Sequence, residues 1–179
     1  MILRIAAAIA LFGASAIGMS SQQTIHVRVV ESKHLRPVTD ECLNITLGKW
    51  RGAELFLPTD SAGQIALTIE DDKVSALFVP AKACNTSSIS GPTPFDSLAH
   101  EISIVTDEYV SCQYSGKLVK DPAWRNASPA QRIPSFSVQE ILDHGITATN
   151  SCTKLRPTAK PGELIIVVRK RTFLEGMRS

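Results

Sequence analysis

Alternating apolar and polar residues predict a protein built mainly from β-strands. Within 24–30, 43–47 and 65–69, apolar side chains occupy every second position, which is typical of a strand with one buried face. Denser apolar runs of strand length occupy 53–57 and 74–79, and two further strands are predicted at 102–106 and 109–114. With the segment 163–169, these runs predict about eight short strands.

The segment 163–169 is the strongest of the predicted strands. Its apolar residues are consecutive rather than alternating: Leu164, Ile165, Ile166, Val167 and Val168. A run of this kind indicates burial on both faces, in the middle of a sheet or sandwich. Turn residues separate the other strands at 60–63 and 70–73, and Asp107-Glu108 predicts a tight hairpin between 102–106 and 109–114.

One short helix is predicted over 138–144. Ser137 and Glu140 have the spacing of a capping box, in which the Ser hydroxyl accepts from the third helical N–H. Gly145 supplies a left-handed residue that ends the helix. A helix of this length is not stable alone and must dock on the sheet. A weaker capping box at 172–175 predicts one further helical turn.

These elements predict a mainly β fold: an Ig-like or transthyretin-like β-sandwich with one short docked helix. The sandwich is expected to be a single domain spanning 24–179. Two long loops are expected at 80–100 and 115–135, where prolines and glycines replace the alternation.

The first 20 residues predict a secretory signal peptide. Arg4 is followed by an uncharged, Ala-rich apolar core, and small residues favour cleavage at about 16–23. The alternative is a buried N-terminal helix. No later run approaches the 18 apolar residues of a membrane-spanning helix. We therefore expect an exported protein, periplasmic or extracellular, with no transmembrane segment after the signal is removed.

Removal of the signal leaves a nearly neutral chain. Arg4 is the only charged residue of the signal peptide, so the remaining chain has 18 basic and 17 acidic residues. A chain this close to neutrality has no global field for attracting nucleic acid, and we expect no nucleic-acid partner.

Four cysteines indicate two disulfides. Cys42, Cys84, Cys112 and Cys152 form an even set in a chain expected to reach an oxidising compartment. A four-thiolate zinc site is the alternative, but no two of these cysteines form the close pair that zinc sites use. Three connectivities are possible, and we favour Cys42–Cys84 with Cys112–Cys152, which staples the two halves separately.

No catalytic residue, cofactor site or metal site is recognised. His100-Glu101 begins like a zinc-protease helix, but Ile104 stands where the second His is required. No G-x-S-x-G elbow or phosphate loop is present. The carboxylate pairs at 71–72 and 107–108 lie in predicted turns, where solvated acidic residues are common.

The C-terminal end carries the one interaction surface that we single out. Basic residues lie beside apolar ones in the set Arg169, Lys170, Arg171, Phe173 and Leu174. Such a combination is a candidate contact for a partner or a membrane surface. A solvated helix end after the strand is the favoured alternative, because binding usually needs a longer apolar stripe.

Two groups of motifs resemble known proteins. The segment Thr59-Asp60-Ser61-Ala62-Gly63, following Arg36-Pro37-Val38, resembles the "TD-x-x-G" turn of carboxypeptidase regulatory-like or transthyretin-like domains. The second half, with Ser137-Val138-Gln139-Glu140 and Lys160-Pro161-Gly162-Glu163, is similar to the tail of exported bacterial proteins that carry this label. The resemblance implies a seven-stranded sandwich and export, and brings no catalytic residues.

The leading hypothesis is an exported, non-enzymatic binding or accessory module of the cell envelope or periplasm, whose partner is a protein or an envelope polymer. One alternative is a hydrolase of envelope polymers that uses dispersed carboxylates or His100. The other is a structural or assembly protein in which 163–169 lies at a sheet edge and pairs with another chain.

Overall fold

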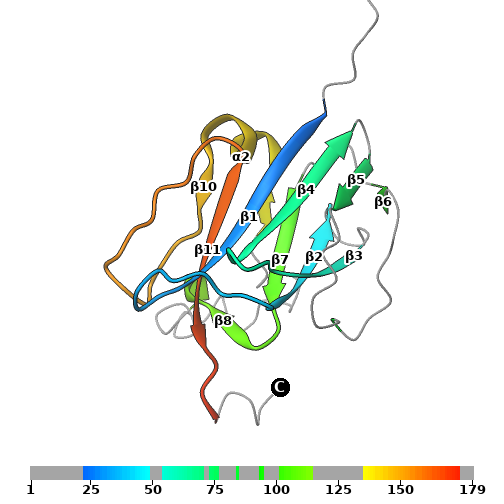
Figure 1. Ribbon diagram of the computed structural model, residues 1–179. Helices are drawn as coiled ribbons and strands as arrows, with labels where there is room; N and C mark the ends of the chain where they lie inside the picture. The colour runs from blue at the N-terminus through cyan, green and yellow to red at the C-terminus, as the bar shows by residue number, and fades with distance from the viewer. Residues whose placement is uncertain are drawn as a thin grey trace, which may run out of the picture.

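Two β-sheets pack face to face in the computed structural model, which describes residues 22–48, 54–70, 73–76, 84, 93–94, 101–114 and 135–173 (Figure 1). The first sheet has the order β10-β11-β1-β4-β5-β6, and β8 also pairs with β11. The second sheet has the order β3-β2-β7-β9. With the single α-helix of the described residues, α2, this confirms the predicted mainly β sandwich.

The strands of the first sheet are β10 (Ile146–Thr147), β11 (Glu163–Lys170), β1 (Gln23–Glu31), β4 (Gln64–Glu70), β5 (Lys73–Ala76), β6 (Thr93–Pro94) and β8 (Tyr109–Ser111). Those of the second are β3 (Glu54–Pro58), β2 (Cys42–Leu47), β7 (Glu101–Thr106) and β9 (Ser135–Ser137). The short strands β6, β9 and β10 were not predicted, because two or three residues cannot display a period. β6 lies within the loop expected at 80–100, whereas 115–134 is outside the described residues.

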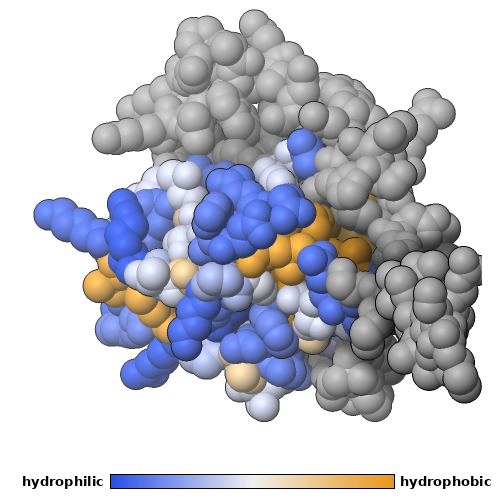
Figure 2. Space-filling model, turned by 90° about the horizontal axis from the view of Figure 1, so that it is seen from above, coloured by the Kyte–Doolittle hydropathy of each residue, from blue (hydrophilic) through white to orange (hydrophobic). Residues whose placement is uncertain are grey.

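The main core lies between the two sheets and follows the alternation read from the sequence. Side chains at every second position of β1, β2 and β4 are buried: Ile25, Val27, Val29, Leu43, Ile45, Leu47, Ile65, Leu67 and Ile69. Their neighbours along each strand point outward, as the two-residue period of a strand requires. Seen from above, the described surface is mainly hydrophilic, with one group of hydrophobic side chains beside the residues drawn in grey and another at the left edge (Figure 2).

β11 is an interior strand, which corrects the hypothesis that it forms a free edge. It runs parallel to β1 on one side, and on the other it pairs with β10 near its start and with β8 near its end. Residues 164–168 are all buried, as the continuous apolar run predicted. Because the side of β11 away from β1 is paired at both ends, the strand is not the continuous free edge that pairing with a second chain requires.

The expected hairpin at Asp107-Glu108 is wrong. β7 pairs with β2 and β9 in the second sheet, whereas β8 pairs with β11 in the first. The turn therefore carries the chain from one sheet to the other. The predicted strand 109–114 also ends early, at Ser111, because a 3-10 turn, η1 (Cys112–Tyr114), follows it.

The helix α2 (Val138–His144) spans the predicted residues and closes the upper end of the sandwich (Figure 1). It links β9 in the second sheet to β10 in the first, and buries Val138 and Ile141. The Ser137 hydroxyl accepts from the Glu140 N–H at 3.4 Å, as the capping box predicted. The Ile141 carbonyl accepts from the N–H groups of Gly145 (2.9 Å) and Gly162 (2.8 Å), which ties the helix to the start of β11.

Gly145 ends the helix with φ 72° and ψ 151°. The positive φ agrees with the expectation, but ψ is extended rather than left-handed, because the chain continues directly into β10. A Cβ atom at this position would lie 2.1 Å from the Lys160 carbonyl oxygen. Glycine is therefore required both by the backbone conformation and by the close approach of a second segment.

Replacing Gly145 with Ala is expected to lower the free energy of unfolding by about 3 kcal/mol or more, since strain and a backbone clash add. Gly162→Ala is the matched control. Gly162 also has a positive φ, 78°, but its added Cβ would meet only Thr24 O at 3.4 Å, so a loss of about 1–2 kcal/mol is expected. Urea denaturation of both variants measures the difference, and equal losses would contradict the proposed clash.

Candidate functional site

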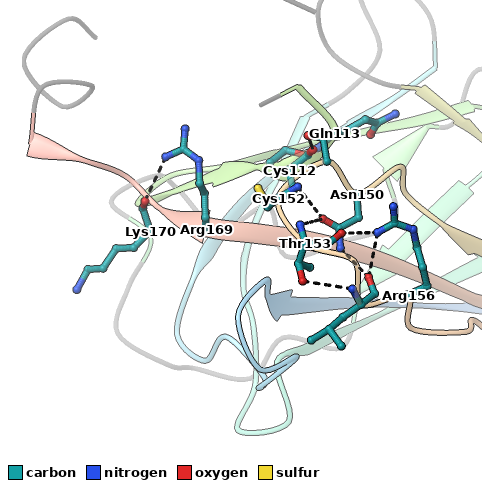
Figure 3. Close-up of a disulfide and its surroundings, with 11 residues drawn as sticks. Cys112, Gln113, Asn150, Cys152, Thr153, Arg156, Arg169 and Lys170 are labelled. Carbon is teal, nitrogen blue, oxygen red and sulfur yellow. Dashed lines mark hydrogen bonds between the residues drawn. A yellow bond between two sulfur atoms is a disulfide. The ribbon is translucent and has the colours of Figure 1, made fainter. Parts of the chain in front are cut away.

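The predicted C-terminal surface occupies the end of β11, which projects below the sheets (Figure 1). Lys170 is exposed, Arg169 and Arg171 are half-buried, and Phe173 is 80% exposed. The Arg169 Nη1 donates to the Lys170 carbonyl at 3.4 Å (Figure 3). Leu174 lies outside the described residues. Among the described part of this surface, Phe173 is thus the one large apolar side chain that is highly exposed.

The cysteines form two disulfides, Cys42–Cys84 and Cys112–Cys152, with Cα–Cα distances of 5.7 and 5.4 Å. This is the connectivity favoured from the sequence. The second disulfide joins η1, which follows β8, to the segment 148–161 that connects β10 to β11. It therefore ties two segments that flank the same side of β11.

Asn150 organises the loop beside the second disulfide (Figure 3). Its side chain is buried, and its Oδ1 accepts from the N–H groups of Cys152 (3.0 Å) and Thr153 (3.3 Å). Its Nδ2 donates to the Leu155 carbonyl at 3.0 Å. The Ser151 N–H and hydroxyl both donate to the Cys112 carbonyl. Asn side chains that bond the backbone two or three residues ahead stabilise a defined turn, so this loop has a fixed shape.

A second, smaller apolar cluster covers the outer face of β11. Its fully buried members are Val30, Cys112, Ile165 and Val167, with Leu35, Cys152 and Ala159 packed against them. These residues come from β1, β11, η1, the loop 32–37 and the segment 148–161. Both faces of β11 are therefore covered by apolar side chains, one by the second sheet and the other by two loops.

Glu41 is the buried carboxylate of the described residues, with 2% of its surface exposed. Its Oε1 accepts from the backbone N–H groups of Glu108 (2.9 Å) and Tyr109 (3.4 Å), in the turn that crosses between the sheets. Burial raises the pKa of Glu41, and the backbone hydrogen bonds oppose this effect. The pKa of Tyr109 is raised by burial and by the negative charges of Glu41, Glu31 and Glu108. Sequence analysis missed Glu41, because a single acidic residue before a strand carries no signal.

Three residues of the Thr59-Asp60-Ser61-Ala62-Gly63 motif have a structural role. The buried Thr59 hydroxyl donates to the Val38 carbonyl at 2.7 Å and accepts from the Glu41 N–H at 3.0 Å. The Asp60 Oδ1 accepts from the N–H groups of Ala62 and Gln64, both at 2.8 Å. At Gly63, which has φ 69°, an added Cβ would lie 2.9 Å from Val29 O. The motif therefore fixes the passage from β3 to β4.

The described residues bring no catalytic constellation together. They contain no group of three or more His, Cys, Asp or Glu side chains placed to hold a metal ion. His100 and the pair at 71–72 lie outside the described residues. The carboxylate oxygen of Glu41 that bonds two amide groups is held inside the protein, where a substrate cannot reach it without rearrangement of the turn.

Comparison of the chain with protein-family models, with curated proteins and with solved structures finds no match. The resemblance to carboxypeptidase regulatory-like and transthyretin-like domains therefore stays a prediction from the motifs.

Both disulfides are expected to persist in the isolated, unreduced protein, so thiol labelling after denaturation should detect no free cysteine. Replacing Cys112 and Cys152 together with Ala should lower the free energy of unfolding by about 3–4 kcal/mol, the chain-entropy estimate for a loop of this length. The double replacement of Cys42 and Cys84 is the control. The Cys42–Cys84 disulfide closes a loop of nearly the same length, 42 residues against 40, so the loss of stability should be similar. Labelling of two or four thiols per chain would contradict the pairing.

The raised pKa of Glu41 predicts a pH-dependent contribution to stability. A carboxyl group whose pKa is higher in the folded than in the unfolded state stabilises the fold fully below the unfolded pKa, close to 4.5. That contribution is lost as pH rises through the folded pKa. The unfolding free energy of the native protein should therefore fall relative to that of Glu41→Gln as pH rises above about 4.5.

Chemical denaturation across this pH range measures the effect. Glu54→Gln, at an exposed position on β3, controls for the removal of one negative charge. If the native protein instead gains stability over Glu41→Gln as pH rises, the backbone hydrogen bonds to Glu41 outweigh its burial, and the assigned direction is wrong.

Proposed function

We propose that the protein is an exported, non-enzymatic binding or accessory module of the cell envelope or periplasm. The observation that carries the proposal is the arrangement of the loop 32–37 and the segment 148–161. Both are held on the rigid first sheet by the second apolar cluster, and the segment 148–161 also by the Cys112–Cys152 disulfide. Loops fixed on a rigid scaffold are the usual place for binding residues.

Two features support export. The disulfides require an oxidising compartment to form and persist. The signal peptide predicted at 1–20 is the route to such a compartment, and it lies outside the described residues. Among the described residues, no helix has the length and apolar character needed to cross a membrane.

A hydrolase is the second candidate, and Glu41 is the observation that favours it. A carboxyl group with a raised pKa near a tyrosine is a common component of active sites. However, Glu41 is almost completely buried, and its carboxylate binds backbone N–H groups of the crossing turn. These contacts support a structural role for Glu41, and the binding module remains the better proposal.

Co-sedimentation with isolated cell envelopes tests the proposal. The exported, oxidised protein is expected to bind saturably, and Glu41→Gln should bind equally well. In parallel, the soluble fraction is analysed for fragments released from envelope polymers. Fragment release by the native protein that is lost in Glu41→Gln would overturn the proposal in favour of the hydrolase. Absence of both binding and fragment release would overturn it outright.

A further inference from the structure

The two loops that cover β11 carry positive charges and no negative ones. The loop 32–37 contributes Lys33 and Arg36, and the segment 148–161 contributes Lys154, Arg156 and Lys160, all five exposed. Neither stretch contains an Asp or Glu, although the whole chain has a formal net charge of only +2. Lys33, Arg36, Lys154 and Arg156 are named the basic face.

The members of the basic face are brought together by backbone and apolar contacts. The Ser32 N–H donates to the Val168 carbonyl at 2.7 Å, which holds the loop 32–37 at the end of β11. Leu35 in this loop packs in the same cluster as Cys152 and Ala159 of the other segment. Figure 1 shows the two loops side by side at the lower left of the sandwich. Figure 3 shows Arg156 and Arg169 on the two sides of Cys152.

The two loops share a short sequence. Leu35-Arg36-Pro37 and Leu155-Arg156-Pro157 are identical tripeptides, each preceded closely by a lysine. Leu35 has φ 54°, in the left-handed region that leucine rarely adopts, and such strain is often found in binding segments. Leu155 is 43% exposed between Lys154 and Arg156. The basic face therefore presents an apolar side chain among its cations.

Glu163 is the acidic residue of β11, and its carboxylate already has a cationic partner. Glu163, on the same face of the sheet, is paired with Arg28 at 2.7 Å. The pKa of Tyr109 is raised by the negative charges of Glu31, Glu41 and Glu108. The Tyr109 side chain packs against the core between the sheets. Tyr109, on which these three charges act, thus lies on the inner side of the first sheet, whereas the loops of the basic face cover the outer side.

We propose that the basic face docks the protein on an anionic phospholipid surface. This inference rests on the proposed binding function and names its partner. Lysine and arginine side chains are attracted to anionic headgroups, and an apolar side chain among them gains further by entering the interface. A purely charged polymer would use the cations and leave Leu155 without a role, so the pairing of both features favours a lipid surface.

Vesicle co-sedimentation of the exported, oxidised protein tests the charge requirement. Vesicles of phosphatidylcholine with about a third phosphatidylglycerol should bind the protein, and pure phosphatidylcholine should not. The triple variant Lys33→Gln, Arg36→Gln, Lys154→Gln should bind about 100-fold more weakly, since each cation contributes about a fivefold factor. Added salt should also weaken binding of the native protein.

The matched control is the triple variant Gln23→Glu, Ser75→Glu, Ser135→Glu. It lowers the net charge by the same three units at exposed positions on β1, β5 and β9. Its binding should fall much less, about tenfold or under, because the charges lie away from the basic face. Equal losses in the two triple variants would overturn the basic face as the docking site. Thermal unfolding verifies that both variants are folded.

A second pair of variants tests whether the partner is a lipid surface. Leu155→Ser should weaken vesicle binding by about fivefold to tenfold, whereas Val105→Ser, which alters a side chain of similar exposure (41%) on β7, should not. Neither substitution should change retention on dextran sulfate. Strong dextran sulfate binding together with equal vesicle binding by Leu155→Ser and native protein would overturn the lipid assignment in favour of an anionic polymer.

The two proposals fail in different ways. If the protein binds isolated envelopes but none of the vesicles, the lipid assignment is wrong and the proposed binding function stands. If it binds neither envelopes nor vesicles, both proposals are wrong.

Discussion

The two-sided burial of β11 is the constraint around which the rest of the protein is arranged. Five consecutive apolar residues, 164–168, place side chains on both faces of the strand, and each face requires an apolar cover. The second sheet covers the inner face. The outer face is covered by the loop 32–37 and the segment 148–161, through Leu35, Cys152 and Ala159. Each fully buried Val or Ile contributes about 1.5–3 kcal/mol, so an uncovered outer face would be costly.

Covering a strand with loops instead of a helix or sheet raises the problem of keeping the loops in place. A disulfide and hydrogen bonds hold the two loops in place. The Cys112–Cys152 disulfide and the Asn150 side chain fix the segment 148–161, and the hydrogen bond from Ser32 to Val168 fixes the other loop. The charged side chains of these loops remain exposed, and the basic face is therefore a consequence of how the strand is buried.

The crossing between sheets at Asp107-Glu108 is the second organising feature. It sends β8 to the open side of β11 and so removes the free edge of that strand. The buried carboxylate of Glu41 holds the turn through the N–H groups of Glu108 and Tyr109. A charged group in this position costs desolvation energy and gains strong hydrogen bonds to the backbone, which explains the opposing influences on its pKa. Glu41 thus links the geometry of the fold to its pH dependence.

The sequence by itself determined the features that depend on near neighbours. Alternation placed β1, β2 and β4, the capping residues placed α2, and the turn residues at 60–63 placed the passage into β4. Each is decided within a few residues, because side-chain periods and caps act locally. The even number of cysteines likewise indicated two disulfides.

Only the tertiary structure decided which strands pair, because an alternating strand specifies a buried face and not a partner. The strand 109–111 could equally have paired with its neighbour in sequence, but it pairs with β11 in the other sheet. The position of Glu41, the convergence of the two Leu-Arg-Pro loops and the extended ψ of Gly145 also arise from contacts between distant segments. Such contacts depend on the packed chain as a whole, and for this reason the basic face could not be recognised from the charge of the sequence.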